Sequence, residues 1–580
     1  MKFTLQGLAI AGVIGIYLFL STLGLSDRGN NPQDAAYNLL AQGLLSGHLY
    51  VAKPVPPSLD RVQDPYDPQQ NQAARFGTSD SLNGVDDFSL YRGHLYLYFG
   101  IAPALLFFIP AHLLTGAWLP HWAAAVLFCS LGLIANICLA NRIRTAHFPN
   151  FPERLAAAWI PLLGLVSYAP VLLARPDMWE IPIACAYCFV SAGLLCVWEA
   201  LEKPEDAVRW LALASAALGV AFASRPTTLL IAPILAAAFI HSAVRSNPRA
   251  WIAAALPLAA CGAAVAMYNF QRFGSPFEFG AKYQLAGEYE SRVHAFSFRY
   301  VWANLHFYLF QGVRWHRWFP FAAEAAVGPL PEGHGVVEHI SGVLLNTPII
   351  WAGAAIPVFI LRVRPGRTFL LVAASVAWAA LGILGLLLFF FGTCARYEFE
   401  FAPPLALAAV LGIMALDQLT SGAARASARV IWIAAGIFSS AFTVFYAVDR
   451  VVHDHIGLAS ALFDSGQFDL ADENYSLAYA LAPKDLLARE GIARLHFVMG
   501  RHADAEREFL DLIGDFPDEP RVWDDYAAVL EQENRLPEAI EAFRRILARF
   551  PNAGTAAHLN ALLSRAASGD HLPADSPAPR

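Results

Sequence analysis

The sequence predicts an all-α protein in which a bundle of about eleven membrane-spanning helices precedes a soluble domain of helical repeats. Hydrophobic residues make up 57% of the chain and charged residues only 15%, whereas soluble proteins are nearer half apolar and a quarter charged. Residues 96–448 carry charge only in short clusters, while 449–580 have the composition of a soluble domain, in which one motif recurs three times. Lipid is therefore the expected solvent for the first part of the chain.

The spans are predicted from runs of roughly 20 apolar residues, the length that crosses a bilayer as a helix. The first run is interpreted as a retained helix, because it lacks a small-x-small cleavage site and further spans follow it. The predicted spans are 5–25, 117–140, 155–175, 179–199, 209–224, 228–244, 250–268, 346–361, 368–391, 399–416 and 429–448.

The apolar segment 97–114 is predicted to lie in the outer interface or re-enter from it. Lys and Arg concentrate in cytoplasmic loops, and the basic clusters face inward only if this segment does not cross and the N-terminus is cytoplasmic. The inside loops then hold Arg142, Arg144, Arg154, Lys203, Arg209, Arg245, Arg249, Arg362, Arg364, Arg367, Arg425 and Arg429, and the outside turns hold Arg175, Arg225 and Arg396. This topology places loops 26–116 and 269–345 and the repeats outside, which is the periplasm if the membrane is a bacterial inner membrane.

The C-terminal part repeats with a step of 34 residues. A small alanine lets two helices approach, an aromatic four residues later fills the groove on the same helix face, and a proline ends the second helix. The matching positions are Ala471, Ala505 and Ala539, then Tyr475, Phe509 and Phe543, then Pro483, Pro517 and Pro551. The pattern resembles the tetratricopeptide repeat family. We predict transmembrane residues 1–448, repeats over 449–567 that bind a protein or polymer, and a disordered tail at 568–580.

An acidic segment follows the first span: Asn31-Pro-Gln-Asp34-Ala35-Ala-Tyr37, continuing to Tyr50. From the residues alone, Asp34 is either a helix cap or a functional carboxylate. The segment resembles the first outer loop of GT-C-fold membrane glycosyltransferases, with protein O-mannosyltransferases and lipid A aminoarabinose transferases as the nearest families. Those families carry Asp-Glu here, whereas this chain has Ala35 in place of the second acid.

Later elements follow the same order as in those families. An aromatic, proline-bearing segment at 96–116 precedes a span, a basic turn at 141–144, another span and an outer Arg175-Pro-Asp177. The resemblance covers about residues 30–200. It implies an inverting enzyme at the outer face, in which an acceptor hydroxyl or amine attacks a sugar carried on polyprenyl phosphate and the lipid phosphate leaves.

The resemblance also implies roles for outer-face residues. Asp34 is the expected general base, and Asp177 orients the acceptor or binds a metal. Guanidinium groups bind phosphate through charge-assisted bonds. The expected donor-phosphate residues are Arg396, Arg225 and Lys282, and the expected substrate-loop residues are Tyr37, Asp87 and Tyr397.

Each of these assignments has a structural alternative. Asp177 is otherwise a turn carboxylate, and the arginines are interfacial anchors. Asp86 and Asp87 either lie over the site or solvate their loop, and we favour solvation. The aromatic residues of loop 269–345 either stack on sugar or lipid, or form an interfacial belt.

Metal, disulfide and nucleic-acid sites have little support in the sequence. All seven cysteines lie in or beside apolar segments, so no disulfide framework is implied. Four histidines of the second outer loop, His306, His316, His334 and His339, lack zinc-site spacing. A divalent metal stays possible, and its ligands are unknown. The net charge of −7 without a basic stripe argues against nucleic acid.

Two other functions stay open. A non-enzymatic carrier or assembly protein would move lipid-linked or polymer substrates and use the repeats as a docking arm. A transporter should carry polar residues within its spans, whereas these spans are almost purely apolar and the acids cluster in outer loops. The chain could also keep the family fold without activity, because Ala35 replaces an acid.

Overall fold

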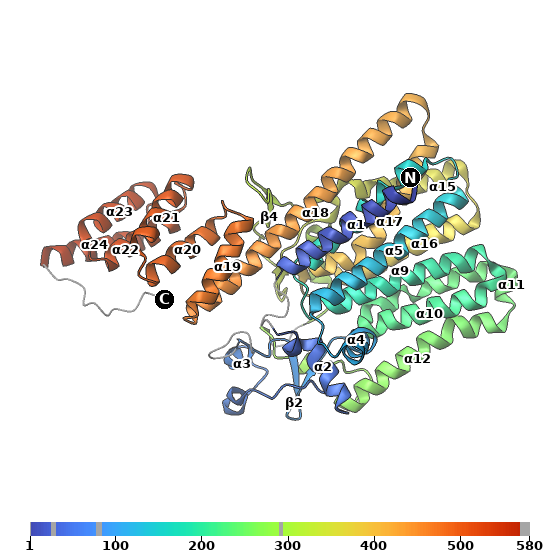
Figure 1. Cartoon of the computed structure of the whole chain (residues 1–580), viewed down its shortest axis with the longest axis horizontal. Helices are drawn as coiled ribbons and strands as arrows, with labels where there is room; N and C mark the ends of the chain where they lie inside the picture. The colour runs from blue at the N-terminus through green and yellow to red at the C-terminus, as the bar shows by residue number, and fades with distance from the viewer. Residues whose placement is uncertain (1, 25–30, 77–83, 289–293, 569–580) are drawn as a thin grey trace. The chain divides into compact units, whose positions relative to one another are not determined.

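The computed structural model describes residues 2–24, 31–76, 84–288 and 294–568. Within these ranges the chain is mostly helical and its only sheets are three two-stranded ones. The chain forms two compact units, Met1–Val451 and Val452–Arg580 (Figure 1). The division falls close to the boundary predicted at 448/449.

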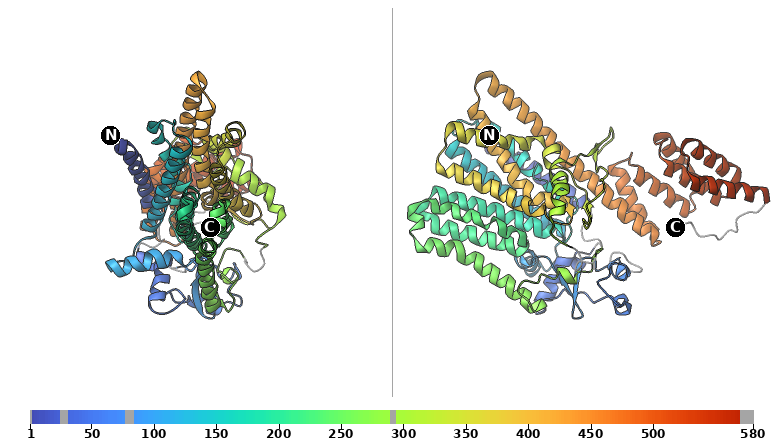
Figure 2. Two further views of the ribbon diagram at one scale, coloured as in Figure 1. Left: turned by 90° about the vertical axis from the view of Figure 1, so that its right-hand side faces the viewer. Right: turned by 180° about the vertical axis from the view of Figure 1, so that it is seen from behind.

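Eight helices in the described part of the chain are long and apolar enough to cross a membrane. They confirm a polytopic helical bundle and coincide with eight of the eleven predicted spans. Neighbouring long helices lie side by side in both views (Figure 2). These helices are α1 (Lys2–Leu23), α5 (His121–His147), α9 (Glu180–Glu202), α10 (Ala207–Ser224), α12 (Pro248–Phe273), α16 (Arg367–Leu387), α17 (Ala395–Leu419) and α18 (Gly422–Asp464).

Two further predicted spans contain shorter apolar helices. The segment η6 (Pro226–Ile240) is a 3₁₀ helix, and at a rise of about 2.0 Å per residue its length approaches the roughly 30 Å thickness of the hydrocarbon core. The other combines η9 (Pro348–Ala354) with α15 (Ala355–Val363). Because a 3₁₀ helix rises further per residue than an α-helix, it needs fewer residues to cross the hydrocarbon core.

The predicted span 155–175 differs from expectation because it is not one helix. It consists of α6 (Glu153–Ala156), α7 (Trp159–Leu165) and α8 (Ala169–Leu173). Tyr168 has a left-handed backbone with φ of 66° and is followed closely by Pro170, which separates α7 from α8. Nearly all of this segment is buried, and irregular backbone is tolerated at membrane depth where protein shields it from lipid.

The doubtful segment 97–114 forms a π-helical turn (Ala104–Phe108) followed by α4 (Ile109–Thr115). Its twelve helical residues cover only about 18 Å at the α-helical rise. Figures 1 and 2 show α4 running across the direction of the long helices. Its most exposed leucines are Leu113 and Leu114. These features suit an interfacial helix, and its place in a membrane stays a prediction.

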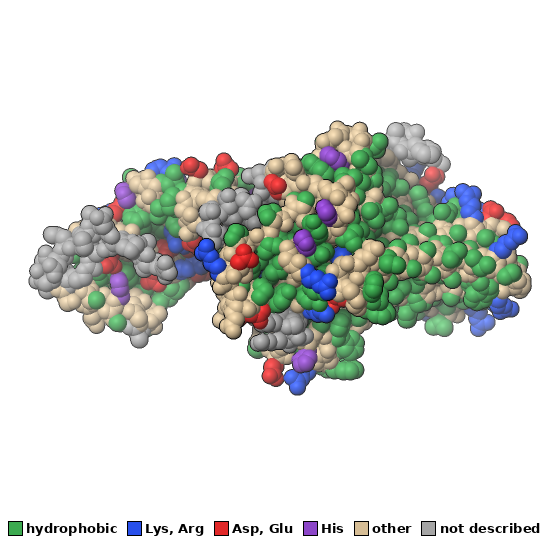
Figure 3. Space-filling model, turned by 90° about the horizontal axis from the view of Figure 1, so that it is seen from below, with side chains coloured by type: hydrophobic (Ala, Val, Ile, Leu, Met, Phe, Trp, Pro, Cys, Tyr) green, Lys and Arg blue, Asp and Glu red, His purple; other side chains and the backbone are tan. Residues whose placement is uncertain are grey.

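The two long loops meet at one end of unit 1. The first contains η1 (Pro32–Asp34), α2 (Ala36–Leu45), η2 (Pro57–Arg61), α3 (Gln72–Phe76), and the hairpin β1 (Phe88–Tyr91) and β2 (His94–Leu97). The second contains η7 (Ala281–Tyr283), η8 (Phe298–Tyr300), α13 (Val301–Phe310), β3 (Arg314–Trp315), β4 (Ala322–Ala323), β5 (Val337–Glu338) and α14 (Val343–Asn346). A bridge between Ser89 and Gln284 joins them. Figure 3 shows the apolar side of the bundle, with Lys and Arg side chains at the end away from these loops.

Unit 2 consists of antiparallel helix pairs, as the repeat pattern predicts. Ala471, Ala505 and Ala539 are fully buried between helices, and the Tyr475 ring lies directly over Gly491. The helices beyond the end of α18 are α19 (Phe468–Leu481), α20 (Leu486–Val498), α21 (His502–Asp515), α22 (Pro520–Gln532), α23 (Leu536–Arg549) and α24 (Ala553–Ser568).

Candidate functional site

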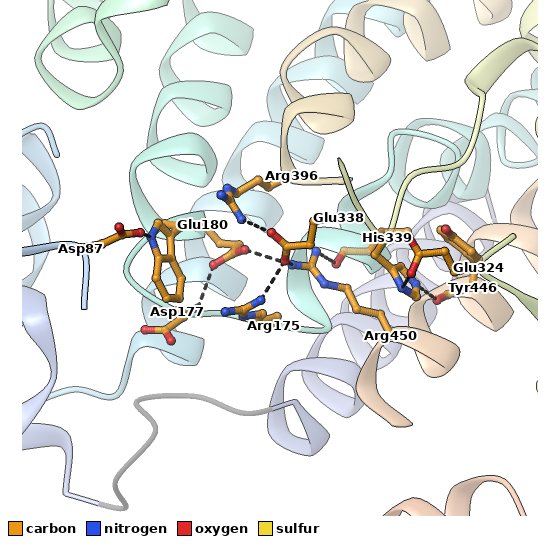
Figure 4. A network of polar contacts seen from close by, with 12 residues as sticks. Asp87, Arg175, Asp177, Glu180, Glu324, Glu338, His339, Arg396, Tyr446 and Arg450 are labelled. Atoms are coloured by element: carbon orange, nitrogen blue, oxygen red, sulfur yellow. Dashed lines mark hydrogen bonds and ion pairs between the residues drawn. The ribbon is translucent and has the colours of Figure 1, made fainter. Parts of the chain in front are cut away.

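A network of charged side chains lies at the loop end of unit 1 and centres on Glu338 (Figure 4). Glu338 Oε1 accepts hydrogen bonds from Arg175 Nη1 at 2.8 Å and from Arg450 Nη2 at 3.4 Å. Glu338 Oε2 accepts one from Arg396 Nη1 at 2.8 Å. One carboxylate is therefore shared by three guanidinium groups from three distant parts of the chain.

Local backbone structure brings these four residues together. The two-residue strand β5 pairs in parallel with β6 (Thr393–Cys394), and Glu338 lies opposite Cys394. This register places Glu338 beside Arg396, in the first turn of α17. Arg175 follows α8 in the turn before α9, and Arg450 lies on α18.

Two charged members of the network are almost completely buried. Arg450 and Glu180 expose 2% and 0% of their side chains, and Arg450 Nη2 lies 3.3 Å from Glu180 Oε1. Arg450 also donates from Nη1 to the Val171 carbonyl at 3.0 Å. Burial alone would raise the pKa of the Glu338 carboxyl, but the neighbouring guanidinium groups hold that pKa below its usual range. Removing a partner from such a network leaves a buried charge uncompensated.

Asp87 connects the first loop to this network. Its carboxylate accepts hydrogen bonds from Trp179 Nε1 and Gln284 Nε2, both at 2.6 Å. The Trp179 ring lies 4.8 Å from the Arg175 guanidinium and 5.9 Å from that of Arg396. Solvation of the loop, which the sequence analysis favoured for Asp87, is therefore wrong, because its carboxylate is tied to a side chain that covers two arginines.

Asp86 is also paired, with Arg75 Nη1 at 3.3 Å. The solvation interpretation fails for this residue as well. Both acids hold the first loop in place.

A second ion pair, between Arg225 and Glu400, adjoins the network. Glu400 Oε1 accepts hydrogen bonds from Arg225 Nε at 3.0 Å and Nη2 at 2.7 Å. The Tyr397 ring lies 5.2 Å from the guanidinium groups of both Arg225 and Arg396. Burial raises the pKa of the nearby Tyr98 phenol well above its usual value, and Asp87 raises it further, so this hydroxyl remains a neutral donor.

His121 lies between the N-terminal end of α2 and the turn that contains Asp177. The Tyr37 backbone N–H donates to His121 Nε2 at 3.3 Å, and His121 Nδ1 lies 3.7 Å from Asp177 Oδ1. Asp177 Oδ1 also accepts a hydrogen bond from the Met178 backbone N–H at 2.7 Å. Asp177 is thus a turn carboxylate, as the structural alternative proposed, and additionally faces a buried histidine.

The Asp34 side chain is exposed, and among described residues its carboxylate makes no hydrogen bond or ion pair, while its backbone N–H donates to the Asn31 carbonyl at 2.9 Å. The N-cap of α2 is Ala35, which has no side-chain capping bond, so the helix-cap alternative for Asp34 is wrong. Lys53 lies near Asp34; burial lowers the pKa of its ammonium group, whereas the Asp34 carboxylate raises it. Tyr37 is fully buried and its hydroxyl donates to the Gly100 carbonyl at 3.2 Å.

Lys282 lies apart from these groups. Its ammonium contacts Glu278 at 3.0 Å and lies over the Tyr283 ring. Hydrogen bonding to Glu278 raises the pKa of Lys282. The structure therefore brings Arg396, Arg225, Tyr397 and Asp87 together, and leaves Lys282 with neighbours of its own loop.

Sequence reasoning missed several members of the site. Glu180 begins an apolar helix, and an acid in such a position was an available signal. Arg450 had been assigned to the repeat domain, two residues beyond the last predicted span. Glu338 and His121 carry no motif that marks them, because their significance comes from neighbours distant in the sequence.

A narrow, mostly apolar pocket extends from the Arg225–Glu400 ion pair into the bundle. It lies between α9, η6, α16 and α17, with Glu400 and Phe399 at one end and Leu194 among its apolar residues. Within the ranges that the structure describes, no group of three or more His, Cys, Asp and Glu residues is arranged to hold a metal. The cysteines are free.

Comparison with known proteins gives three findings. The tetratricopeptide repeat family matches residues 456–520 and 491–554, so this part of the chain is a tetratricopeptide repeat domain. No curated protein matches the sequence. A solved structure similar to this one is the crystal structure of ArnT from Cupriavidus metallidurans bound to undecaprenyl phosphate. The identity is 12% and the TM-score 0.43, over 80% of this chain and 79% of that one.

Proposed function

We propose that this protein is an inverting membrane glycosyltransferase that uses a sugar on polyprenyl phosphate and acts at the outer face of a bacterial inner membrane. The arginine cluster at the loop end of an apolar bundle is the observation that carries the proposal. A lipid anchored beside the bundle can present its phosphate there, and guanidinium groups bind phosphate oxygens with charge-assisted bonds. Arg396 and Arg225 are the proposed donor-phosphate residues, with the ring of Tyr397 between them.

Asp34 is the proposed general base. A base must have an accessible carboxylate within reach of the acceptor proton, and Asp34 is exposed on the same loop end. The acceptor hydroxyl or amine loses its proton to Asp34 and forms a bond to the anomeric carbon. The bond from that carbon to the phosphate oxygen breaks, and the arginines stabilise the departing lipid phosphate. A single displacement of this kind inverts the anomeric centre.

Asp177 is proposed to position the acceptor side of the site through His121, because these side chains link the turn before α9 to the N-terminus of α2. The apolar pocket beside Glu400 is proposed to widen when the donor binds and to hold the first part of its polyprenyl chain. The repeat domain is proposed to hold a protein or polysaccharide acceptor in the periplasm. Lys282 has weaker support as a phosphate ligand, since Glu278 already pairs with it.

The test compares Asp34→Asn with Asp60→Asn, an exposed carboxylate of the same loop. Both variants are brought to wild-type membrane abundance, and glycans on envelope protein, lipid and polysaccharide are profiled. We expect Asp34→Asn to lower one glycoconjugate by about 10²–10⁴-fold, the typical contribution of a general base, and Asp60→Asn to leave it unchanged. The lost species identifies the acceptor class.

Purified protein in nanodiscs separates an enzyme from a carrier. We expect the wild-type chain to transfer sugar from a polyprenyl-phosphate donor without other proteins. If Asp34→Asn keeps full transfer, Asp34 is not the base and Asp177→Asn becomes the decisive variant. If wild-type protein transfers nothing while deletion removes a glycoconjugate in cells, the carrier alternative is favoured.

A further inference from the structure

Glu338 differs from the other acids that pair with arginines in this site. It exposes 26% of its side chain, whereas Glu400 exposes 4% and Glu180 none. Glu400 and Glu180 also lie within long helices, while Glu338 lies on a two-residue strand. Glu338 is therefore the most exposed acid and has the weakest backbone support.

The backbone beside Glu338 is held in place by its neighbour His339. His339, the next residue, has a φ of 47°, and Gly333 has a φ of 78°. The His339 ring stacks on Tyr446 with centroids 4.4 Å apart, and lies 3.8 Å from the carboxylates of Glu324 and Asp449. His339 thus anchors the strand on one side of Glu338, and the side chain of Glu338 can turn away without releasing the loop.

The three arginines form a better pocket for phosphate than for a carboxylate. Glu338 offers two oxygens, so Arg175 and Arg450 share Oε1 at unequal distances of 2.8 and 3.4 Å. A phosphate monoester offers three oxygens and up to two negative charges, enough for one oxygen to each guanidinium group. Arg175 and Arg396 expose 16% and 14% of their side chains, so an arriving anion can reach them.

We propose that Arg175, Arg396 and Arg450 form a single phosphate-monoester pocket, and that Glu338 occupies it as an internal substitute that the released polyprenyl phosphate must displace. The proposal deepens the proposed function, because the phosphate is that of the polyprenyl carrier. Glu338 then has two effects: it keeps three guanidinium groups compensated in the empty protein, and it weakens binding of the released polyprenyl phosphate by competing with it. Its carboxyl stays ionised at neutral pH, since the arginines hold its pKa low.

Binding of decaprenyl phosphate to the full-length chain in nanodiscs tests this proposal. We expect Glu338→Gln to bind about tenfold more tightly than wild type, because an amide competes poorly for three cations. Glu338→Asp keeps the charge but shortens its reach, so we also expect tighter binding, by a smaller factor. The matched control is Glu332→Gln, an exposed glutamate of the same loop that pairs with Arg299, and it should bind as wild type does.

The opposite result overturns the proposal. If Glu338→Gln and Glu338→Asp both bind more weakly than wild type or equally well, Glu338 positions the arginines and does not compete with the ligand. The aspartate variant keeps the test decisive if the glutamine variant does not fold. In the double variant Glu338→Gln/Arg175→Ala the gain in affinity should disappear.

Inorganic phosphate distinguishes the source of the ligand. If it stabilises Glu338→Gln against thermal unfolding at millimolar concentration but not wild type, the pocket recognises the phosphate group by itself, as proposed. If only the lipid binds and the Glu338 variants do not change its affinity, the proposal fails. Because these are binding measurements, absence of sugar transfer would count against the proposed enzyme activity and leave the pocket intact.

Discussion

The two units differ in how deeply their charged side chains are buried. In unit 1, several buried charges meet in one network, in which Arg450 and Glu180 are almost fully enclosed. In unit 2, many charged residues form exposed pairs, as Arg549 does with Asp518 and Arg545 does with Glu541. Exposed pairs stabilise a protein little, whereas a buried network is sensitive to the loss of any member. The meeting of several buried charges at the loop end of unit 1 therefore marks a candidate site, whereas the exposed pairs of unit 2 belong to its surface.

The largest expected effect comes from removing a buried cation. Arg450→Met leaves Glu180 without its guanidinium partner, and we expect a loss of about 3–5 kcal/mol in the free energy of unfolding. Arg549→Met, at an exposed arginine that pairs with the exposed Asp518, should cost less than about 1 kcal/mol. Thermal unfolding of both variants in the same detergent or nanodisc gives the comparison. Equal losses would show that the two units do not differ in this respect.

Glycine contacts provide a smaller test that applies to both units. A Cβ on Gly412 in α17 would collide with the Ala352 backbone, and one on Gly491 in α20 would collide with the Tyr475 ring. We expect Gly412→Ala and Gly491→Ala each to cost about 1–3 kcal/mol. Gly514→Ala meets open space and should stabilise helix α21 by up to about 1 kcal/mol. Denaturation of the three variants measures these changes in the free energy of unfolding. If Gly412→Ala does not change it, α17 and η9 can move apart without loss of stability.

The acids of unit 2 predict that the stability of this unit depends on pH. Burial raises the pKa of Glu490, with a further contribution from Asp525, and burial likewise raises the pKa of Asp525. Above the usual carboxyl pKa of about 4, the folded unit then binds more protons than the unfolded chain, so stability falls as pH rises. Hydrogen bonds from Lys484 and Arg489 lower the pKa of Asp515, and that contribution is lost only in stronger acid.

We therefore expect α20 and α22 to be better protected from hydrogen exchange at pH 5 than at pH 7 in the full-length chain, after correction for intrinsic exchange rates. Glu490→Gln should reduce the difference, whereas Glu519→Gln, a change at the N-terminus of α22, should keep it. Protection that increases from pH 5 to pH 7 in wild type would reverse the assigned sign.

Salt should have the smallest effect. At 1 M salt the screening length falls to about 3 Å, so exposed pairs such as Lys484–Asp515 should lose most of their contribution. We expect unit 2 to be destabilised by less than about 1 kcal/mol, while the network around Glu338 is unaffected. Hydrogen exchange at low and high salt reports on each unit separately, and a larger loss in unit 1 would mean that its network is open to solvent.

Much of the fold could be predicted because its signals are local. Apolar runs revealed the spans, and the 34-residue step revealed the repeats, which the family comparison and the buried alanines confirm. The interruption of 155–175 was harder to foresee, since its backbone breaks are stable only when neighbouring helices shield them. Of the predicted site residues, Arg396 and Arg225 lie beside the same Tyr397 ring while Lys282 does not join them, and their roles stay predictions.

The amino-acid sequence by itself determined which segments prefer lipid, where the repeats begin, and that the acids and arginines of the first unit lie in loops or at helix ends. Only the tertiary structure decided which of these charges meet. Glu338 and Arg396 are joined by a parallel pair of two-residue strands, too short to leave a pattern, and Arg175 and Arg450 reach the same carboxylate from elements far apart in the chain. Local periodicity specifies an element, but the partner of a buried charge depends on packing between distant elements.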